Sequence, residues 1–404
     1  MMRARINFYT LIGLLSCGLL AMTSCTSGAG RDAHDHEPVD VGDYLAAAYI
    51  SPQMQDLGSS STGYVVLINK TGDVSTIETS GMDIAALAWS EQGLFFSDLN
   101  NDYLLGPEGL STSTSPKTDY QHALFPTAEG AVGLFNEGFI DDGYVEQVVE
   151  FDGETSQRHD VEGLYLVAGM CDGVMYGIAE PTGPYIEEAA GRGIESDGEY
   201  GFNALMLTQL SATKDGKEEL ITIQEVPDSD QWHFDVPCEH GVLRHLATRH
   251  EEGTGERTAV LRRWDTSTGE FNEVELRHRD GAPVEMDEEY GFQAHGTAPM
   301  SAGRDGYQWV SVATNELMTT NTSTGETEPV VKLEGDHDLA ATTFLTQFTD
   351  SHLFTLSFTI GDDAMVLHSC DRYTGDLETT LEVSELSKNL NKEDVLRGFA
   401  VPPR

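Results

Sequence analysis

Short runs of alternating or β-branched residues, each followed by a turn, recur along most of the chain. The segment 64–79, YVVLINKTGDVSTIET, shows the unit, in which two such runs are joined at a Thr-Gly pair. This alternation predicts β-strands, and the Gly-containing turn between them predicts a hairpin. Similar hairpins lie at 259–278, 316–333 and 365–383, with looser versions at 144–162, 203–226 and 102–115. Only 384–396, near the C-terminus, suggests a helix.

A second type of hairpin precedes most of these. It occurs at 85–98, 122–136, 165–180, 233–248, 295–314 and 343–359. Two hairpins in succession make a four-stranded blade, and self-similarity at a period of about 40–60 residues is typical of propellers and related arrays. The sequence therefore predicts an all-β fold with six complete blades.

The segments left at the two ends predict a seventh blade. One strand-like run, 44–50, precedes the first hairpin, and one apolar run, 398–401, follows the last. If the C-terminal segment supplies the inner strand and the N-terminal segment the next three, the ring closes without an open sheet edge. We therefore expect a seven-bladed β-propeller over residues 44–404, in preference to another all-β array such as two β-sandwiches.

The turns of about four hairpins have the pattern D-x-x-T-G, as in Asp265-Thr266-Ser267-Thr268-Gly269. These hairpins resemble the repeats of bacterial quinoprotein-like and surface-layer-type (YVTN-like) propellers. Quinone-binding repeats have a Trp after the Gly, whereas Phe271, Thr327 and Leu377 occupy that neighbourhood here. A quinone cofactor is therefore not expected.

The first 24 residues are predicted to be an export signal. Arg3 and Arg5 precede an apolar or small-residue segment, 6–22, that is too short and too rich in small residues for a membrane span of about 20 strongly apolar residues. The segment Met22-Thr23-Ser24-Cys25 resembles the lipobox of bacterial lipoproteins. That resemblance implies that Cys25 is acylated, for example with palmitate, and becomes the mature N-terminus.

Two alternatives to this interpretation stay open. Leu14-Leu15-Ser16-Cys17 fits the lipobox leucine better but would leave the apolar residues 18–22 after the cleavage site, and an ordinary cleaved signal would make Cys25 incidental. We prefer Cys25, followed by a flexible polar tether over 25–43. The protein is then extracytoplasmic and anchored by its N-terminal lipid to the bacterial cell membrane.

The charge of the chain is strongly unbalanced, with 68 acidic against 23 basic residues and a formal net charge of −45. Such a surface repels nucleic acid and anionic lipid headgroups and attracts cations, so no nucleic-acid partner is expected. The apolar content is ample for a core and argues against disorder. We interpret the acidity as salt adaptation rather than as a specific acidic function.

The longest loops, 51–63, 181–201 and 280–291, are expected on one face of the propeller. Long loops on a rigid scaffold are where binding residues usually lie. The last two are acidic and could bind calcium through carboxylate oxygens, although no spacing matches a calcium-binding loop. A solvated acidic surface is the preferred interpretation.

Three predicted inner strands begin with a short segment that contains a Gln and ends in a His. These segments are Tyr120-Gln121-His122, Gln231-Trp232-His233 and Phe292-Gln293-Ala294-His295. Their imidazoles would meet at one end of the ring and could hold a transition metal or polarise a substrate oxygen. The residues predicted to open other inner strands, and to complete such a site, are Glu162, Asp83 and Asp338. In the preferred alternative, the His and Gln side chains only form hydrogen bonds between neighbouring blades.

Cys171 and Cys238 occupy matching places in the fourth and fifth blades, each just before a turn. They can form a structural disulfide if their Cα atoms lie within about 7 Å of each other. Cys370 then stays free on an outer hairpin.

Local catalytic motifs are absent from the sequence, which excludes only enzymes that have them. We expect a binding protein whose ligand is a protein, a glycan or a small molecule. The alternative is a metal-assisted propeller hydrolase or lactonase in which His122, His233 and His295 hold the ion. Fold alone does not decide between them, since propellers support many unrelated activities.

Overall fold

The computed structural model describes residues 41–52, 62–140, 143–194, 204–213, 216–226, 229–230, 233–250, 254, 256–286, 300–303, 306–333, 342–359, 365–383 and 394–403. Only the backbone is described for residues 41, 229, 230, 233, 234, 300, 342, 343, 358 and 359. The chain divides into two units, 1–36 and 37–404, and all of these residues belong to the second.

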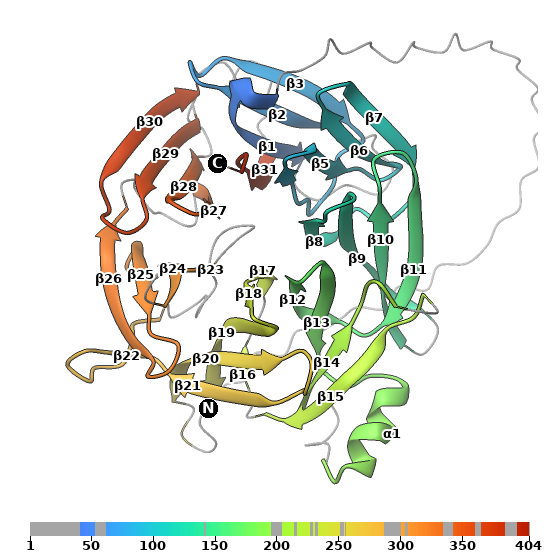
Figure 1. Cartoon of the computed structure of the whole chain (residues 1–404), viewed down its shortest axis with the longest axis vertical. Helices are drawn as coiled ribbons and strands as arrows, with labels where there is room; N and C mark the ends of the chain where they lie inside the picture. The colour runs from blue at the N-terminus through green and yellow to red at the C-terminus, as the bar shows by residue number, and fades with distance from the viewer. Residues whose placement is uncertain are drawn as a thin grey trace, which may run out of the picture. The chain divides into compact units, whose positions relative to one another are not determined.

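The described strands form seven sheets arranged in a ring, which confirms the predicted seven-bladed β-propeller (Figure 1). A 3₁₀ helix, η1 (Val41–Asp43), precedes the first strand. Blade 1 consists of β31 (Asp394–Ala400), β1 (Tyr44–Pro52), β2 (Gly63–Asn69) and β3 (Val74–Thr79). Blade 2 consists of β4 (Ala88–Ser90), β5 (Gly93–Ser97), β6 (Asn101–Gly106) and β7 (Gly109–Thr114).

The next two blades also follow the predicted hairpins. Blade 3 consists of β8 (Gln121–Pro126), β9 (Ala131–Ile140), β10 (Gly143–Phe151) and β11 (Ser156–Glu162). Blade 4 consists of β12 (Tyr165–Cys171), β13 (Val174–Ala179), β14 (Ala204–Gln209) and β15 (Glu219–Glu225), with the helix α1 (Pro184–Gly191) between β13 and β14.

The last three blades differ more from one another. Blade 5 contains β16 (Ser229–Asp230), β18 (Cys238–Glu239), β19 (Val242–His250), β20 (Arg257–Asp265) and β21 (Phe271–Glu275). Blade 6 contains β22 (Arg277–His278), β23 (Met300–Ala302), β24 (Tyr307–Ser311), β25 (Glu316–Thr320) and β26 (Glu326–Lys332). Blade 7 contains β27 (Thr342–Phe348), β28 (His352–Thr359), β29 (Met365–Asp371) and β30 (Leu377–Val383).

The two ends of the described chain meet in blade 1. β31 pairs antiparallel with β1, with Ala47 opposite Ala400 and Pro52 opposite Asp394. β31 begins at Asp394, earlier than the predicted run 398–401. The helix expected over 384–396 is described only at 394–396, and these residues belong to β31. Alternating burial from Asp394 to Arg397 explains the difference, because every second side chain enters the core.

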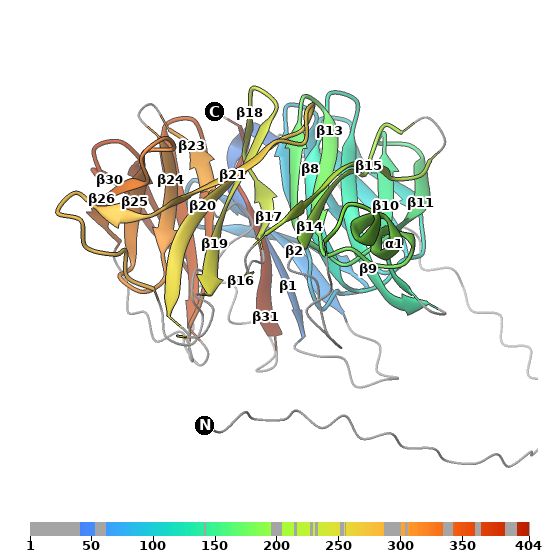
Figure 2. The ribbon, with the colours of Figure 1, turned by 90° about the horizontal axis from the view of Figure 1, so that it is seen from below.

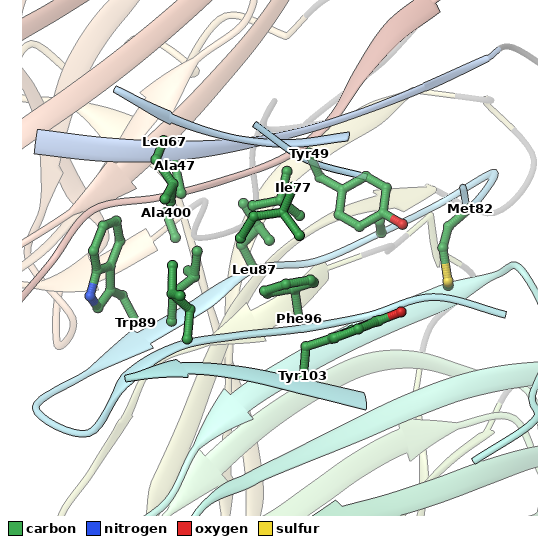
Figure 3. Packing of buried hydrophobic residues seen from close by; sticks show 14 of the residues in the cluster. Ala47, Tyr49, Leu67, Ile77, Met82, Leu87, Trp89, Phe96, Tyr103 and Ala400 are labelled. Carbon is green, nitrogen blue, oxygen red and sulfur yellow. The ribbon is translucent and has the colours of Figure 1, made fainter. Parts of the chain in front are cut away.

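The core lies between neighbouring blades. Between blades 1 and 2, Tyr49 and Ile77 face Leu87 and Phe96, and the rings of Phe96 and Tyr103 stack with centroids 4.7 Å apart (Figure 3). Burying one such aromatic side chain stabilises the fold by about 1.5–3 kcal/mol. The alternation that predicted the strands therefore also supplies the surfaces that hold the ring together.

The D-x-x-T-G turns have a physical explanation in the structure. The Asp265 carboxylate accepts the backbone N–H groups of Ser267 and Thr268 at 2.9 and 2.8 Å. Gly269 follows with a φ of 71°. A Cβ at Gly269 would lie only 2.6 Å from Cβ of Thr222 on the outer strand of blade 4. Glycine is therefore needed both for the turn and for close packing between blades.

One predicted hairpin is confirmed only in part. In the segment 233–248, expected to pair within blade 5, β18 pairs with β19 as predicted, but β17 (His233–Val236) pairs in parallel with β12 of blade 4. In Figure 1, β17 and β18 lie nearer the axis of the ring than β19, β20 and β21 of blade 5. β17 can lie beside β12 because Gly169 has no side chain: a Cβ there would be 2.6 Å from the carbonyl oxygen of Val236.

The displaced strand also explains the disulfide. Cys171 ends β12 and Cys238 begins β18, and the two form a disulfide with their Cα atoms 5.3 Å apart. Because β17 lies against β12, the chain that follows it reaches Cys171 within bonding range. Cys370 is a free, buried cysteine on β29.

The helix α1 was not predicted, since the segment 181–201 was expected to be a loop. It has eight residues, begins with Pro184 and buries only Ala189, so its periodic signal is short.

No helix in the described ranges combines the length and the apolar character that a membrane crossing requires.

Candidate functional site

The inner strands begin at one face of the ring, which we call the inner-strand face. β31 and β8 begin at this face, and β1 ends there, since Pro52 lies opposite Asp394. In Figure 2, which views the ring edge-on, the start of β31 and the end of β9 lie at the same edge. Charged and polar side chains from blades 1, 2 and 3 meet here.

An ion pair joins blades 1 and 2 at this face. The Arg397 Nη2 atom on β31 lies 2.9 Å from an oxygen of Asp83, which precedes β4, and donates to the carbonyl oxygen of Pro52 at 2.9 Å. The side chains are 16% and 28% exposed, respectively. Burial lowers the pKa of Arg397, while the Asp83 charge raises it. The guanidinium is thus partly withdrawn from water, and among the described residues Asp83 is its carboxylate partner at ion-pair distance.

Tyr120 adds a hydroxyl group from blade 3. The backbone N–H of Asp83 donates to the carbonyl of Asp119 at 2.8 Å, and Ile84 forms a parallel bridge with Tyr120. Burial, and next the charge of Asp83, raise the pKa of Tyr120, so its phenol stays protonated at neutral pH. Within the described ranges the Tyr120 hydroxyl has no hydrogen-bond partner. Together with Asp83 and Arg397 it forms a group that we call the blade 1–3 cluster.

His122, two residues after Tyr120, is buried together with Glu146. Their Nδ1 and Oε1 atoms are 3.2 Å apart, and the two side chains are 2% and 0% exposed. Burial raises the pKa of Glu146, and the neighbouring imidazole lowers it. The same Oε1 atom accepts the backbone N–H of Tyr165 at 2.9 Å, which connects blade 3 to blade 4. The arrangement therefore positions strands rather than presenting an imidazole to solvent.

Gln121 connects blade 3 to blade 2. Its Oε1 atom accepts the backbone N–H of Ala86, in blade 2, at 3.0 Å. This contact links two blades, as the preferred alternative of the sequence analysis expects for Gln, whereas His122 pairs with Glu146 inside blade 3.

The other predicted ligands do not come together in the part of the chain that is described. Glu162 ends β11, and so does not open an inner strand as predicted. His295, Asp338 and Cys25 lie outside the described residues, and only the backbone of His233 is described, paired with Val167. No group of three His, Cys, Asp or Glu side chains in the described part could hold a metal ion. The predicted metal site therefore stays a prediction.

Sequence reasoning missed Arg397 and Glu146. Arg397 was assigned to no strand, because the final inner strand was expected to start at residue 398. Glu146 and Gln147 are buried polar residues of β10, and the apolar Val148 and Val149 follow them. A buried carboxylate needs a partner. The place of Glu146 in a partly apolar strand was therefore the sequence signal that could have predicted a buried pair such as that with His122.

Comparison with known proteins supports the fold. Residues 41–188 match a family described as YycP, beta-propeller domain, and the match extends from β1 into α1, without β31 of blade 1. No curated protein matches the chain.

Several solved structures align with the chain. The beta-propeller domain of the Trilobed protease from Pyrococcus furiosus is 12% identical, with 83% of this chain and 97% of that one covered and a TM-score of 0.46. TolB from Acinetobacter baumannii is 11% identical, with 88% and 83% covered and a TM-score of 0.40. AztD from Citrobacter koseri is 10% identical, with 84% and 95% covered and a TM-score of 0.37. At these identities no activity or ligand is transferred to this chain.

Proposed function

We propose that the protein is an extracytoplasmic binding protein, anchored by a lipid on Cys25, that takes its ligand at the inner-strand face. The observation that carries this proposal is the blade 1–3 cluster. Asp83, Tyr120 and Arg397 come from three blades, remain partly exposed and retain unused hydrogen-bonding capacity. Polar groups that converge on a rigid scaffold in this way are typical of binding sites.

The chemistry of the cluster indicates the kind of group it would recognise. Arg397 offers donors, Asp83 offers acceptors, and the Tyr120 hydroxyl can act as either. A net charge of −45 makes an anionic ligand unfavourable. The cluster thus suits a neutral, hydroxyl-bearing or cationic group, as found on glycans, small polar molecules and protein side chains.

The lipid anchor is part of the proposal. β1, the first strand of the propeller, ends at the inner-strand face, so it starts at the opposite face, near the end of β31. The cluster therefore lies at the other face of the propeller from the start of its first strand. Metabolic labelling with palmitate tests the anchor, and we expect incorporation into the full chain and none into Cys25→Ala.

The binding site is tested with a glycan array and a thermal-shift library of small polar molecules, applied to the protein without residues 1–24. For a ligand of the cluster, Arg397→Gln should weaken binding by about 10-fold or more, and Tyr120→Phe by about 2–10-fold. Arg192→Gln is the matched control, because Arg192 forms an exposed ion pair with Glu188 on α1. If no ligand is found, or if the ligands found bind all four proteins equally, the proposal is wrong.

A further inference from the structure

Blade 7 contains a separate group of polar side chains, at the hairpin turn between β27 and β28. The hydroxyl oxygen of Ser351 lies 2.6 Å from Nδ1 of His352. Nε2 of the same imidazole lies 2.7 Å from a carboxylate oxygen of Glu378, which belongs to the outer strand β30. We call these three side chains the blade 7 triad.

Strand pairing brings the triad together. Ser351 lies in the turn that is closed by a hydrogen bond from the backbone N–H of Thr349 to the carbonyl of His352, at 2.9 Å. His352 begins β28 and lies opposite Asp371, at the end of β29. β30 pairs with the other edge of β29, so the imidazole reaches past the end of β29 to meet Glu378.

The hydrogen bonds of the triad determine where its protons lie. A carboxylate only accepts hydrogen bonds, so Nε2 of His352 donates its N–H to Glu378. In the neutral imidazole Nδ1 then has no proton, and it accepts the O–H of Ser351. A hydroxyl bonded to a base, with that base oriented by a carboxylate, is the arrangement that activates serine as a nucleophile.

The base of the triad is shielded while its nucleophile stays accessible. The side chain of His352 is 16% exposed, and its ring lies 6.0 Å from that of the buried Phe354. Because little water surrounds the imidazole, its hydrogen bonds are stronger than they would be in solvent. Ser351 is only half-buried and Glu378 is 50% exposed, so a solute can approach the hydroxyl from the surface.

The same turn offers donors for a substrate oxygen. Within the described ranges, the backbone N–H groups of Asp350 and Ser351 donate no hydrogen bond. Backbone N–H groups of this kind, including that of the nucleophile itself, form the oxyanion holes of serine hydrolases. They are therefore available to stabilise the oxygen that becomes negative when Ser351 adds to a carbonyl group.

We propose that the blade 7 triad is an esterase site with Ser351 as its nucleophile. Oγ of Ser351 attacks the ester carbonyl carbon, its proton passes to Nδ1 of His352, and the departing alcohol takes that proton as its C–O bond breaks. Water then attacks the acyl-serine and gives a proton to His352, which returns it to Oγ as the carboxylic acid leaves. Glu378 is a positioning residue, since it touches only the imidazole.

This activity goes beyond the proposed binding function and belongs to another part of the molecule. β27 is the inner strand of blade 7, so it begins at the inner-strand face and the turn after it lies at the opposite face. A site at a surface turn is best suited to an ester with a small acyl group. The net charge of −45 favours neutral or cationic esters over anionic ones.

The test uses the purified full chain and two probes. A fluorophosphonate reacts with activated serines, and peptide mass spectrometry locates the modified residue. Hydrolysis of p-nitrophenyl acetate, a neutral ester with a small acyl group, measures turnover, and the rate of the chain unfolded in urea is subtracted. Ser267 is the matched control, because it is also a serine in a hairpin turn, but its Oγ donates to the Asp265 carboxylate at 2.7 Å.

We expect Ser351 to be modified at least about 10-fold faster than Ser267, and this difference to vanish in His352→Gln. Turnover should fall by about 100-fold or more in Ser351→Ala and in His352→Gln, and by less than about 2-fold in Ser267→Ala. Glu378→Gln should lower kcat by at least about 10-fold and leave KM unchanged, because it alters the base and not the binding of the ester. Equal thermal unfolding of all variants checks that they fold.

Four results would overturn the inference. These are equal modification of Ser351 and Ser267, modification of Ser351 that persists in His352→Gln, turnover no faster than that of the unfolded chain, and an unchanged kcat in Glu378→Gln. None of them affects the test of the blade 1–3 cluster, which depends on Arg397 and Tyr120. The two proposals can therefore fail separately.

Discussion

Cys171 and Cys238 are 67 residues apart in the sequence and bonded in the structure, and their bond joins blade 4 to blade 5. It closes at the point where β17 has left its own blade to pair with β12. The disulfide, Gly169 and the parallel pairing together determine the local structure of the inner wall between these two blades. Removing one of them should affect the others.

Removal of the disulfide should destabilise the propeller. For a loop of this length, Cys171→Ser/Cys238→Ser should lower the free energy of unfolding by about 2–4 kcal/mol, mainly because the unfolded chain regains freedom. Urea denaturation measures the loss, and hydrogen exchange should rise at residues 233–236. Reduction of the wild type should have the same effect. Cys370→Ser is the control for loss of a thiol, and equal stability of the double variant and the wild type would contradict the prediction.

Asp235 should make the stability depend on pH. It lies in β17 with a φ of 68°, and burial raises the pKa of its carboxyl from 3.8 to about 7. The folded protein then keeps a proton that the unfolded chain loses near pH 4. The stability that Asp235 contributes is therefore fully present below about pH 4, declines as the pH rises, and is lost above about pH 7.

Asp235→Asn should remove this pH dependence. Asparagine also tolerates positive φ, so the backbone is preserved. The carboxyl lies deep among protein atoms while the residue keeps partial access to water, which screens some of the effect, and we expect a gain of about 2 kcal/mol at pH 8. At pH 4 the variant and the wild type should be equally stable. Urea unfolding at both pH values measures this, and a difference that does not change with pH would contradict it.

His122 and Glu146 should contribute to stability rather than hold a metal. His122→Ala leaves a buried carboxylate without its partner and should cost about 3–5 kcal/mol. Glu146→Gln keeps an oxygen that can accept the Tyr165 N–H and should cost about 1 kcal/mol. Urea denaturation and metal analysis on the same samples check both. If His122→Ala lost a stoichiometric metal and kept its stability, the structural interpretation of this pair would be wrong.

Salt should stabilise the protein strongly. At a net charge of −45 the folded surface repels itself, and raising NaCl from about 0.1 M to about 1 M shortens the screening length from about 10 Å to about 3 Å. The unfolding temperature should rise steeply over this range and level off above it. Sucrose is the control, because it favours burial without screening charge. An equal rise in unfolding temperature with NaCl and with sucrose would show that charge repulsion is unimportant.

Much of the fold was predictable because its signals are local. Alternation over a few residues and a turn such as Asp265–Gly269 are visible in any short window, and seven blades follow from counting them. Even the partners Cys171 and Cys238 could be named, because they occupy equivalent places in adjacent repeats. The sequence by itself therefore determined the fold class, the number of blades and the two cysteines that can meet.

Tertiary structure decided the pairing of β17, the partner of Arg397 and the exposure of Phe139. These features depend on which surfaces compete for the same neighbour. A four-residue strand such as β17 could pair with β19 or with β12, and Gly169 and the disulfide favour β12. Arg397 meets Asp83 only because the last strand lies beside the first. Phe139 is exposed because β9 and β10 pair beyond the start of β8. Pairing, register and burial join residues that are distant in the chain, and no local pattern encodes them.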